Sequence, residues 1–380
     1  MTNRGFVIRE RVRRLRGDDQ VTISDAELLV LIACNVLTTV GLAGDIARHL
    51  QNPDDLQGDF LSGWHLVLYG GVTTVALWLG VGSLRHGPGF VWSAGTTTVG
   101  FGLLAFGGVF DSIWHAQFGT EANVEALVSP PHLTVFAGLT FLAASPVVVL
   151  WRREARRLGW IASIVALSSV VTTVLVISLF TGFLSPLASG MSLSFGYVEP
   201  LIGESPVDYD QVRGLGVAVW TTAVLVAAFT LILVRFRPMP GLVALSVFLC
   251  GAPALLLTDP AVIQPLVIGY AVSGLVTEAM VALTGKPTLG RLAAAAMGAL
   301  MGAMIWLSTF ALLQRDDRLG WSTAMWSGTV VLSGLVGAAG AAEVGVRIAR
   351  VAAVVAHLGH GAVVLRQAGH GRQGVRRLDV

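Results

Sequence analysis

The sequence has little charge, and almost none of its positive charge comes from lysine. Only 13% of its 380 residues are charged, whereas a soluble domain carries about 25%. Lys286 is the single lysine in the chain. With 54% hydrophobic residues and a mean hydropathy of +0.73, the chain cannot cover itself with a polar surface. The composition excludes a soluble protein and indicates an integral membrane protein that partners the lipid bilayer.

Cysteine and the common soluble catalytic motifs are also scarce. Cys34 and Cys250 both lie in apolar stretches, so we expect small buried hydrophobes rather than a disulfide or a metal-binding pair. The first 20 residues are basic and polar without an apolar core, which argues against a cleavable signal peptide. The sequence contains no phosphate-binding loop, serine nucleophile elbow or nucleic-acid motif, so no nucleic-acid partner is expected.

Long apolar runs predict an all-α, polytopic transmembrane bundle of about ten helices. A bilayer core requires roughly 20 apolar residues per helix. The runs of that length are 26–48, 64–84, 88–113, 131–151, 158–183, 213–236, 240–258, 261–284, 289–313 and 321–345. The chain then divides into a basic N-terminus, two duplicated helical hairpins, the remaining transmembrane bundle and a tail, at residues 1–25, 26–157, 158–345 and 346–380.

The charges of the connections predict how the bundle is oriented. Arginine gathers in alternate connections, for example between Arg152 and Arg157, and the intervening connections are mostly acidic. Arginine-rich short loops stay in the cytoplasm. We therefore expect a multi-pass protein of the cell membrane with both termini cytoplasmic. The long outer loop 185–212 is either a lid over the outer face or a solvated loop.

One polar pattern occurs twice in the N-terminal half. Asp-x3-His ends one predicted helix, and a His-Leu pair begins the next. The copies are separated by 66, 66 and 67 residues, and their polar members are Asp45, His49 and His65, then Asp111, His115 and His132. We interpret the pattern as an internal duplication of a two-helix hairpin.

The spacing within each copy suits a metal site. Residues four apart share one helical face, so Asp111 and His115 can approach the same atom, and the following loop returns His132 to the same depth. Each hairpin thus offers one carboxylate and two imidazoles, a set suited to copper, iron or zinc. The second loop adds Glu121 and Glu125, again four residues apart.

The positions along the helices favour a cation as well. Asp45 and Asp111 lie near the C-termini of their predicted helices, where a bare carboxylate is disfavoured by roughly 0.3–1 kcal/mol. His65 and His132 lie near N-termini, which favour neutral imidazole. Ser62 and Ser129 are expected to be N-caps. The alternative is that these groups face water or pair with one another.

The pattern of Asp-x3-His on one membrane helix, with a His at the start of the next, resembles the C subunit of the copper membrane monooxygenases. This family includes the particulate methane and ammonia monooxygenases. The resemblance implies copper ligands at Asp45, His49 and His65 or at Asp111, His115 and His132, and oxidation of a small apolar substrate. Here the motif is duplicated and the chain has more predicted helices.

The sequence leaves several functions open. The leading prediction is a membrane metalloprotein with an Asp/His transition-metal site at the extracytoplasmic face, with copper favoured over zinc or iron and with oxidoreductase activity. A transporter of a metal ion or small solute would use the same residues as an entry site. A haem b protein would use two of the histidines, such as His65 and His132. A non-catalytic subunit of a homo- or hetero-oligomer is the last alternative. Two further acids, Glu278 and Glu343, are either functional or paired with arginine.

Overall fold

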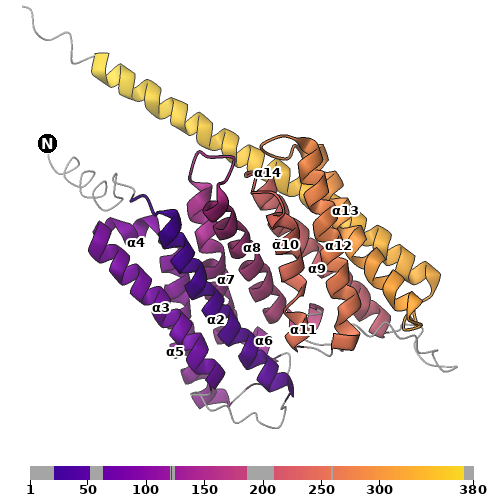
Figure 1. The fold of residues 1–380 in the computed structure, drawn as a ribbon. Helices are drawn as coiled ribbons and strands as arrows, with labels where there is room; N and C mark the ends of the chain where they lie inside the picture. The colour runs from indigo at the N-terminus through magenta and orange to yellow at the C-terminus, as the bar shows by residue number, and fades with distance from the viewer. Residues whose placement is uncertain are drawn as a thin grey trace, which may run out of the picture.

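The chain folds into an all-α bundle in which the long helices lie side by side (Figure 1). The computed structural model describes residues 21–51, 63–119, 121, 125–185, 209–257 and 260–371, and no β-sheet occurs in these ranges. Helices are expected because a backbone in lipid must satisfy its own hydrogen bonds. Their bounds are α2 Asp25–Gln51, α3 Gly63–His86, α4 Gly89–Ser93, α5 Gly95–Phe118, α6 Glu125–Val128, α7 Pro130–Trp151, α8 Trp160–Phe180, α9 Tyr209–Leu233, α10 Leu242–Gly251, α11 Ala254–Leu257, α12 Pro260–Thr284, α13 Arg291–Arg315 and α14 Thr323–Gly371.

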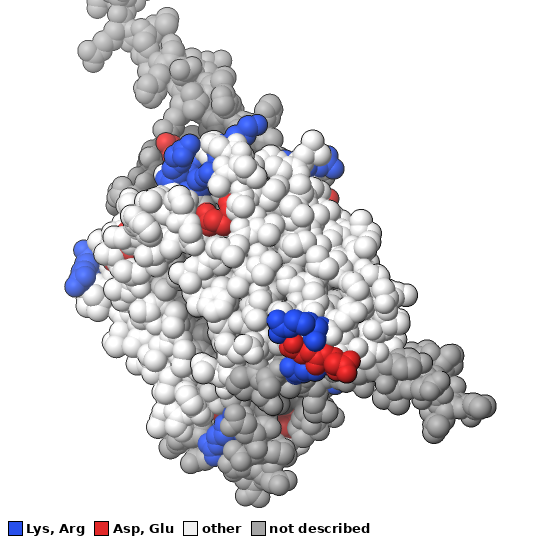
Figure 2. Space-filling view, turned by 45° about the vertical axis from the view of Figure 1, so that its right-hand side comes forward, with Lys and Arg blue, Asp and Glu red and all other residues white. Residues whose placement is uncertain are grey.

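Nine helices within the described residues are long and apolar enough to cross a membrane. Large apolar side chains on their outer faces, such as Leu77, Phe106 and Val331, are exposed, as expected of a lipid-facing surface. Figure 2 shows a broad band with few charged residues below the blue arginines at the top of the view. The predicted polytopic membrane bundle of about ten helices is confirmed.

The tenth predicted span, 240–258, differs from a full transmembrane helix. It forms α10 and α11, which are separated by Ala252 and Pro253, and its apolar part is shorter than the other nine. Pro253 has no N–H to donate, so it interrupts the helical hydrogen bonds. The chain still crosses the bundle here, because α10 begins beside α8 and α11 lies at the opposite end (Figure 1).

The first four long helices form two antiparallel hairpins. Helix α2 packs along α3, and α5 packs along α7, while α2 also contacts α7 and α3 also contacts α5. If α2 is exchanged with α5 and α3 with α7, the same contacts result. An internal duplication predicts this symmetry. Helix α8 packs on α2 and α7 and joins this group to the helices from α9 to α14.

Glycines at repeated positions allow both hairpins to pack closely. A Cβ added at Gly71 would meet the backbone of Thr38, and one at Gly138 would meet the backbone of Leu104. Both pairs are related by the same offsets as the Asp/His pattern, and so are a second set of contacts, Gly41 with Leu68 and Gly107 with Val135. The duplication therefore extends from the polar residues to the helix contacts that place them.

The arginine-rich connections gather at one end of the bundle. Arg153 pairs with Asp25 at the start of α2, and Arg235 donates to the backbone oxygen of Trp151. The described chain thus begins at this end, and α14, after the turn that follows Arg315, runs back towards it (Figure 1). Both ends of the described chain thus approach the same side of the bundle, as an even number of crossings requires. Helix α14 continues as one helix to Gly371.

Candidate metal centre

The second hairpin is shaped at its turn to bring polar groups together. Helix α5 ends at Phe118, and the next residue, Gly119, has a φ of 81° and donates its N–H to the backbone oxygen of His115. This left-handed conformation suits glycine and directs the chain back so that Glu121 reaches His115. Pro130 and Pro131 begin α7, where a missing N–H costs nothing. His132 is consequently held in the first turn of α7.

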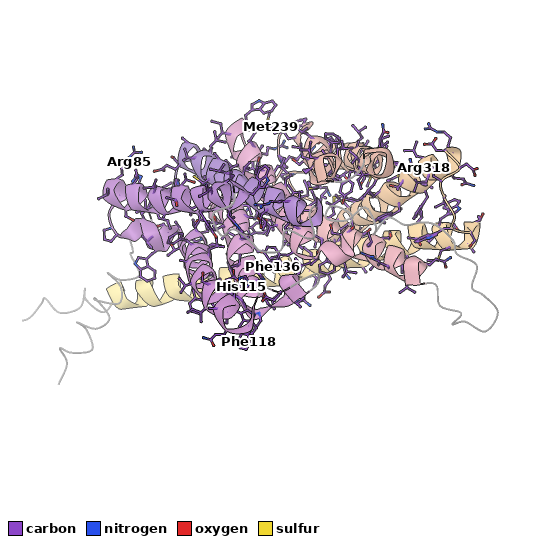
Figure 3. All side chains as sticks on the ribbon, turned by 90° about the horizontal axis from the view of Figure 1, so that it is seen from below. Arg85, His115, Phe118, Phe136, Met239 and Arg318 are labelled. Atoms are coloured by element: carbon purple, nitrogen blue, oxygen red, sulfur yellow. The ribbon has the colours of Figure 1, made fainter. Side chains whose placement is uncertain are left out.

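Asp111, His115 and His132 form a compact three-residue cluster, which we call the Asp111 triad. Each offers one potential ligand atom, and these atoms lie within 4.8 Å of one another. Asp111 Oδ1 is 3.5 Å from His115 Nε2 and 3.4 Å from His132 Nε2. This oxygen is buried and makes no hydrogen bond within the described part of the chain. Figure 3 shows His115 on the same side of the bundle as Phe118 and Phe136, and far from Arg318.

Glu121 closes the triad from the loop side. Its Oε2 lies 2.7 Å from His115 Nε2, and its Oε1 is buried without a hydrogen bond among the described groups. Burial alone would raise the pKa of Glu121, but hydrogen bonds from its own backbone N–H, Ser129 and His115, with the charge of His132 when that imidazole is protonated, lower it overall. The carboxylate therefore stays ionised beside the triad and adds a negative charge that favours a cation.

Ser129 orients His132. It occupies the N-cap position of α7, as expected, but its hydroxyl makes no capping bond to the backbone. Instead Ser129 Oγ lies 2.8 Å from His132 Nδ1. If Nδ1 carries the proton and donates to Ser129, then the lone pair of Nε2 is free for a cation placed between Nε2 and Asp111 Oδ1. A partner at the far nitrogen is the usual way in which a metal-binding imidazole is held.

The first hairpin repeats the central contact of the second. Asp45 Oδ2 lies 3.4 Å from His65 Nε2, and both side chains are mostly buried. The His65 ring stacks on Tyr69, with ring centroids 5.7 Å apart and an interplanar angle of 7°. His49 lies in the last turn of α2, but its side chain is outside the described residues, and so is that of Glu125 in α6.

The sequence did not predict that Tyr69 belongs to the centre. It also did not predict the bond between Ser129 and His132. Tyr69 lies four residues after His65 and Ser129 three before His132, so each shares a helical face or turn with a predicted ligand. This spacing is the sequence feature from which both residues could have been predicted.

The two remaining acids have structural partners. Glu278 Oε2 accepts hydrogen bonds from the N–H groups of Val243 and Ala244 at the start of α10. Glu343 pairs with Arg347 one turn later on α14. The predicted alternative of pairing with arginine fits Glu343, whereas Glu278 instead supplies the acceptor that the first turn of α10 needs.

No family model matches the sequence, and neither a curated protein nor a solved structure is similar enough to be matched. The chemistry of the centre therefore has to be argued from its own side chains. Those side chains are two imidazoles and a carboxylate, with a second carboxylate within hydrogen-bonding distance of one imidazole.

Proposed function

We propose that the protein is a membrane metalloprotein that binds a transition-metal ion at the Asp111 triad, with Glu121 as an additional ligand or as the partner of His115. The observation that carries this proposal is the spacing of the three ligand atoms, all within 4.8 Å of one another.

The separations suit metal ligands better than direct hydrogen bonds. Asp111 Oδ1 lies 3.4 and 3.5 Å from the two imidazole nitrogens, whereas a good hydrogen bond between such atoms is about 2.7–3.2 Å. Four ligands at about 2.0–2.1 Å from a tetrahedral ion are separated from one another by about 3.3 Å. A cation between these atoms would satisfy Asp111 Oδ1, which has no hydrogen bond to any residue that the structure describes.

Copper is the favoured ion, and oxidation of a small apolar substrate is the favoured reaction class. Two imidazoles and a carboxylate also suit zinc and iron, and the resemblance to copper monooxygenases tips the choice. The arginine distribution supports an extracytoplasmic site, because the triad lies at the end of the bundle opposite the arginine-rich connections.

Transport is the weaker alternative. Glu278 is the intramembrane acid that a proton-coupled pathway through the second half would use first. Its carboxylate is engaged in capping α10. Uptake of labelled copper into proteoliposomes would nevertheless favour the transporter.

The experiment is metal analysis of the full-length protein purified in detergent after copper repletion and removal of loosely bound ions. We expect at least one copper ion per chain, lost from Asp111→Asn and from His132→Ala. The matched control is His86→Ala, because His86 also pairs with a carboxylate, that of Glu27 at 2.7 Å, but lies at the arginine-rich end. Wild-type protein without bound metal, or equal loss from the control variant, would overturn the proposal.

A further inference from the structure

At one position beside the centre, the two hairpins carry different aromatic residues. Tyr69 on α3 and Phe136 on α7 are equivalent, because they follow His65 and His132 by four residues each. The duplication therefore has a phenol in one copy where it has a plain aromatic ring in the other. Such a difference at the centre of a repeated unit suggests a task that only one copy performs.

Tyr69 lies close to the first cluster and on the helix that contacts the second hairpin. Its ring stacks on His65, the partner of Asp45. The Tyr69 hydroxyl also interacts electrostatically with two carboxylates, that of Asp111 and that of Asp45. This reach across the hairpins agrees with the contact between α3 and α5. Tyr69 thus contacts the Asp45–His65 pair through His65 and lies within electrostatic range of the Asp111 triad.

Phe136 has a different neighbour. Its ring stacks on Phe180 of α8, with centroids 4.7 Å apart. The equivalent of Tyr69 in the second hairpin therefore packs towards the rest of the bundle and has no hydroxyl with which to meet a carboxylate. Of the two equivalent residues, Tyr69 and Phe136, only Tyr69 can therefore connect the two clusters.

We propose that the Asp45–His65 pair and the Asp111 triad form one centre joined by Tyr69, in which the charge of Asp45 strengthens the binding of a divalent transition-metal ion at the triad. This inference rests on the proposed function, because it concerns the same ion. Tyr69 and Asp45 act as positioning and charge-supplying residues, and neither belongs to the triad itself.

Electrostatics explain why the charge of Asp45 should affect metal binding at the Asp111 triad without direct contact. Charges that are partly buried are screened by water and salt much less than charges on an open surface. Asp45 and Asp111 are only 15% and 16% exposed. Binding at one cluster is then linked to the state of the second.

The test measures zinc affinity, by competition with a chromophoric chelator, on the full-length protein in detergent. Zinc is used because it binds such ligands without redox chemistry. Asp45→Asn should weaken binding at the triad on the order of tenfold, and Asp45→Glu, which keeps the charge, should restore most of it. Asp25→Asn, an acid at the other end of α2, is the matched control and should leave the affinity unchanged.

Tyr69→Phe supplies the second variant, with Tyr270→Phe as its control in the other half of the bundle. If Tyr69 joins the clusters, the effects of Asp45→Asn and Tyr69→Phe will not add in the double variant. Unchanged zinc affinity in Asp45→Asn and additive effects in the double variant would overturn this inference while leaving the proposed function intact. Wild-type protein that binds no metal would overturn both.

Discussion

Asp111 Oδ1 lies 3.4 Å from His132 Nε2, and the equivalent atoms of the first hairpin, Asp45 Oδ2 and His65 Nε2, lie at the same distance. The pairing joins the C-terminal part of one helix to the first turn of the next. Carboxylates at helix C-termini are unfavourable and neutral imidazoles at N-termini are favourable. The fold thus builds the same cation-seeking contact twice, and Glu121 beside the second copy supplements it.

Replacing Ser129 with alanine should weaken metal binding without unfolding the protein. His132 Nδ1 loses its 2.8 Å partner, and removing such a supporting group typically lowers metal affinity about 10–100-fold. No backbone N–H loses a capping bond, because Ser129 makes none. Competition titration measures the affinity and thermal unfolding measures the stability. Ser112→Ala, beside Asp111 but bonded to its own helix, is the control, and an equal effect there would contradict this role for Ser129.

Glu121 should stabilise the metal-free protein at neutral pH, and this contribution should be lost in acid. Its pKa is lower in the fold than in the unfolded chain, so its ionised form contributes stability that is present above the unfolded pKa and lost as the pH falls through the lowered folded pKa. Glu121→Gln should be less stable than wild type at pH 7, with the difference shrinking as the pH falls below the ordinary pKa of a glutamate. Thermal unfolding across that range measures it. A difference that is independent of pH would show that charge is not the cause.

Of the two adjacent glycines Gly70 and Gly71 on α3, only Gly71 should be needed for the close contact with α2. A Cβ at Gly71 would come within 2.6 Å of the Thr38 backbone nitrogen, whereas a Cβ at Gly70 meets nothing within 4 Å. Gly71→Ala should destabilise the protein by about 1–3 kcal/mol, while Gly70→Ala should be neutral or stabilising by up to about 1 kcal/mol. Thermal unfolding of the two variants compares them. Equal stabilities would show that the hairpin does not need this contact.

Glu278 should prove structural. Glu278→Ala removes the acceptor for two N–H groups of α10 and should lower stability by about 1–3 kcal/mol. Glu278→Gln, which keeps an acceptor oxygen, should lose less. Copper content should be unchanged in both. Loss of copper uptake into proteoliposomes with stability intact in Glu278→Gln would instead support the transport alternative.

Most of the fold could be predicted from the sequence because lipid imposes a simple rule. An apolar run of sufficient length becomes a helix, and the ends of α2 and α3 lie within a few residues of those expected. The break between α10 and α11 was missed because hydropathy does not detect the lost N–H of Pro253 inside an apolar run. Helix neighbours such as α3 and α5 follow from packing between distant segments, which no local pattern contains.

The candidate site was predicted as far as helical periodicity and duplication extend. The spacing of Asp111 and His115 places them on one face, and the repeat pointed to His132. Local spacing does not specify side-chain rotamers, so the bond between Ser129 and His132 was not expected. Tyr69 was missed because its importance depends on a contact across the two hairpins.

X-ray absorption spectroscopy of the copper-loaded protein tests the central claim most directly. The account predicts nitrogen and oxygen ligands at about 2.0 Å, with the outer-shell scattering of imidazole that diminishes in His132→Ala and is unchanged in His86→Ala. A first shell dominated by sulfur, or imidazole scattering that is the same in His132→Ala as in wild type, would contradict it.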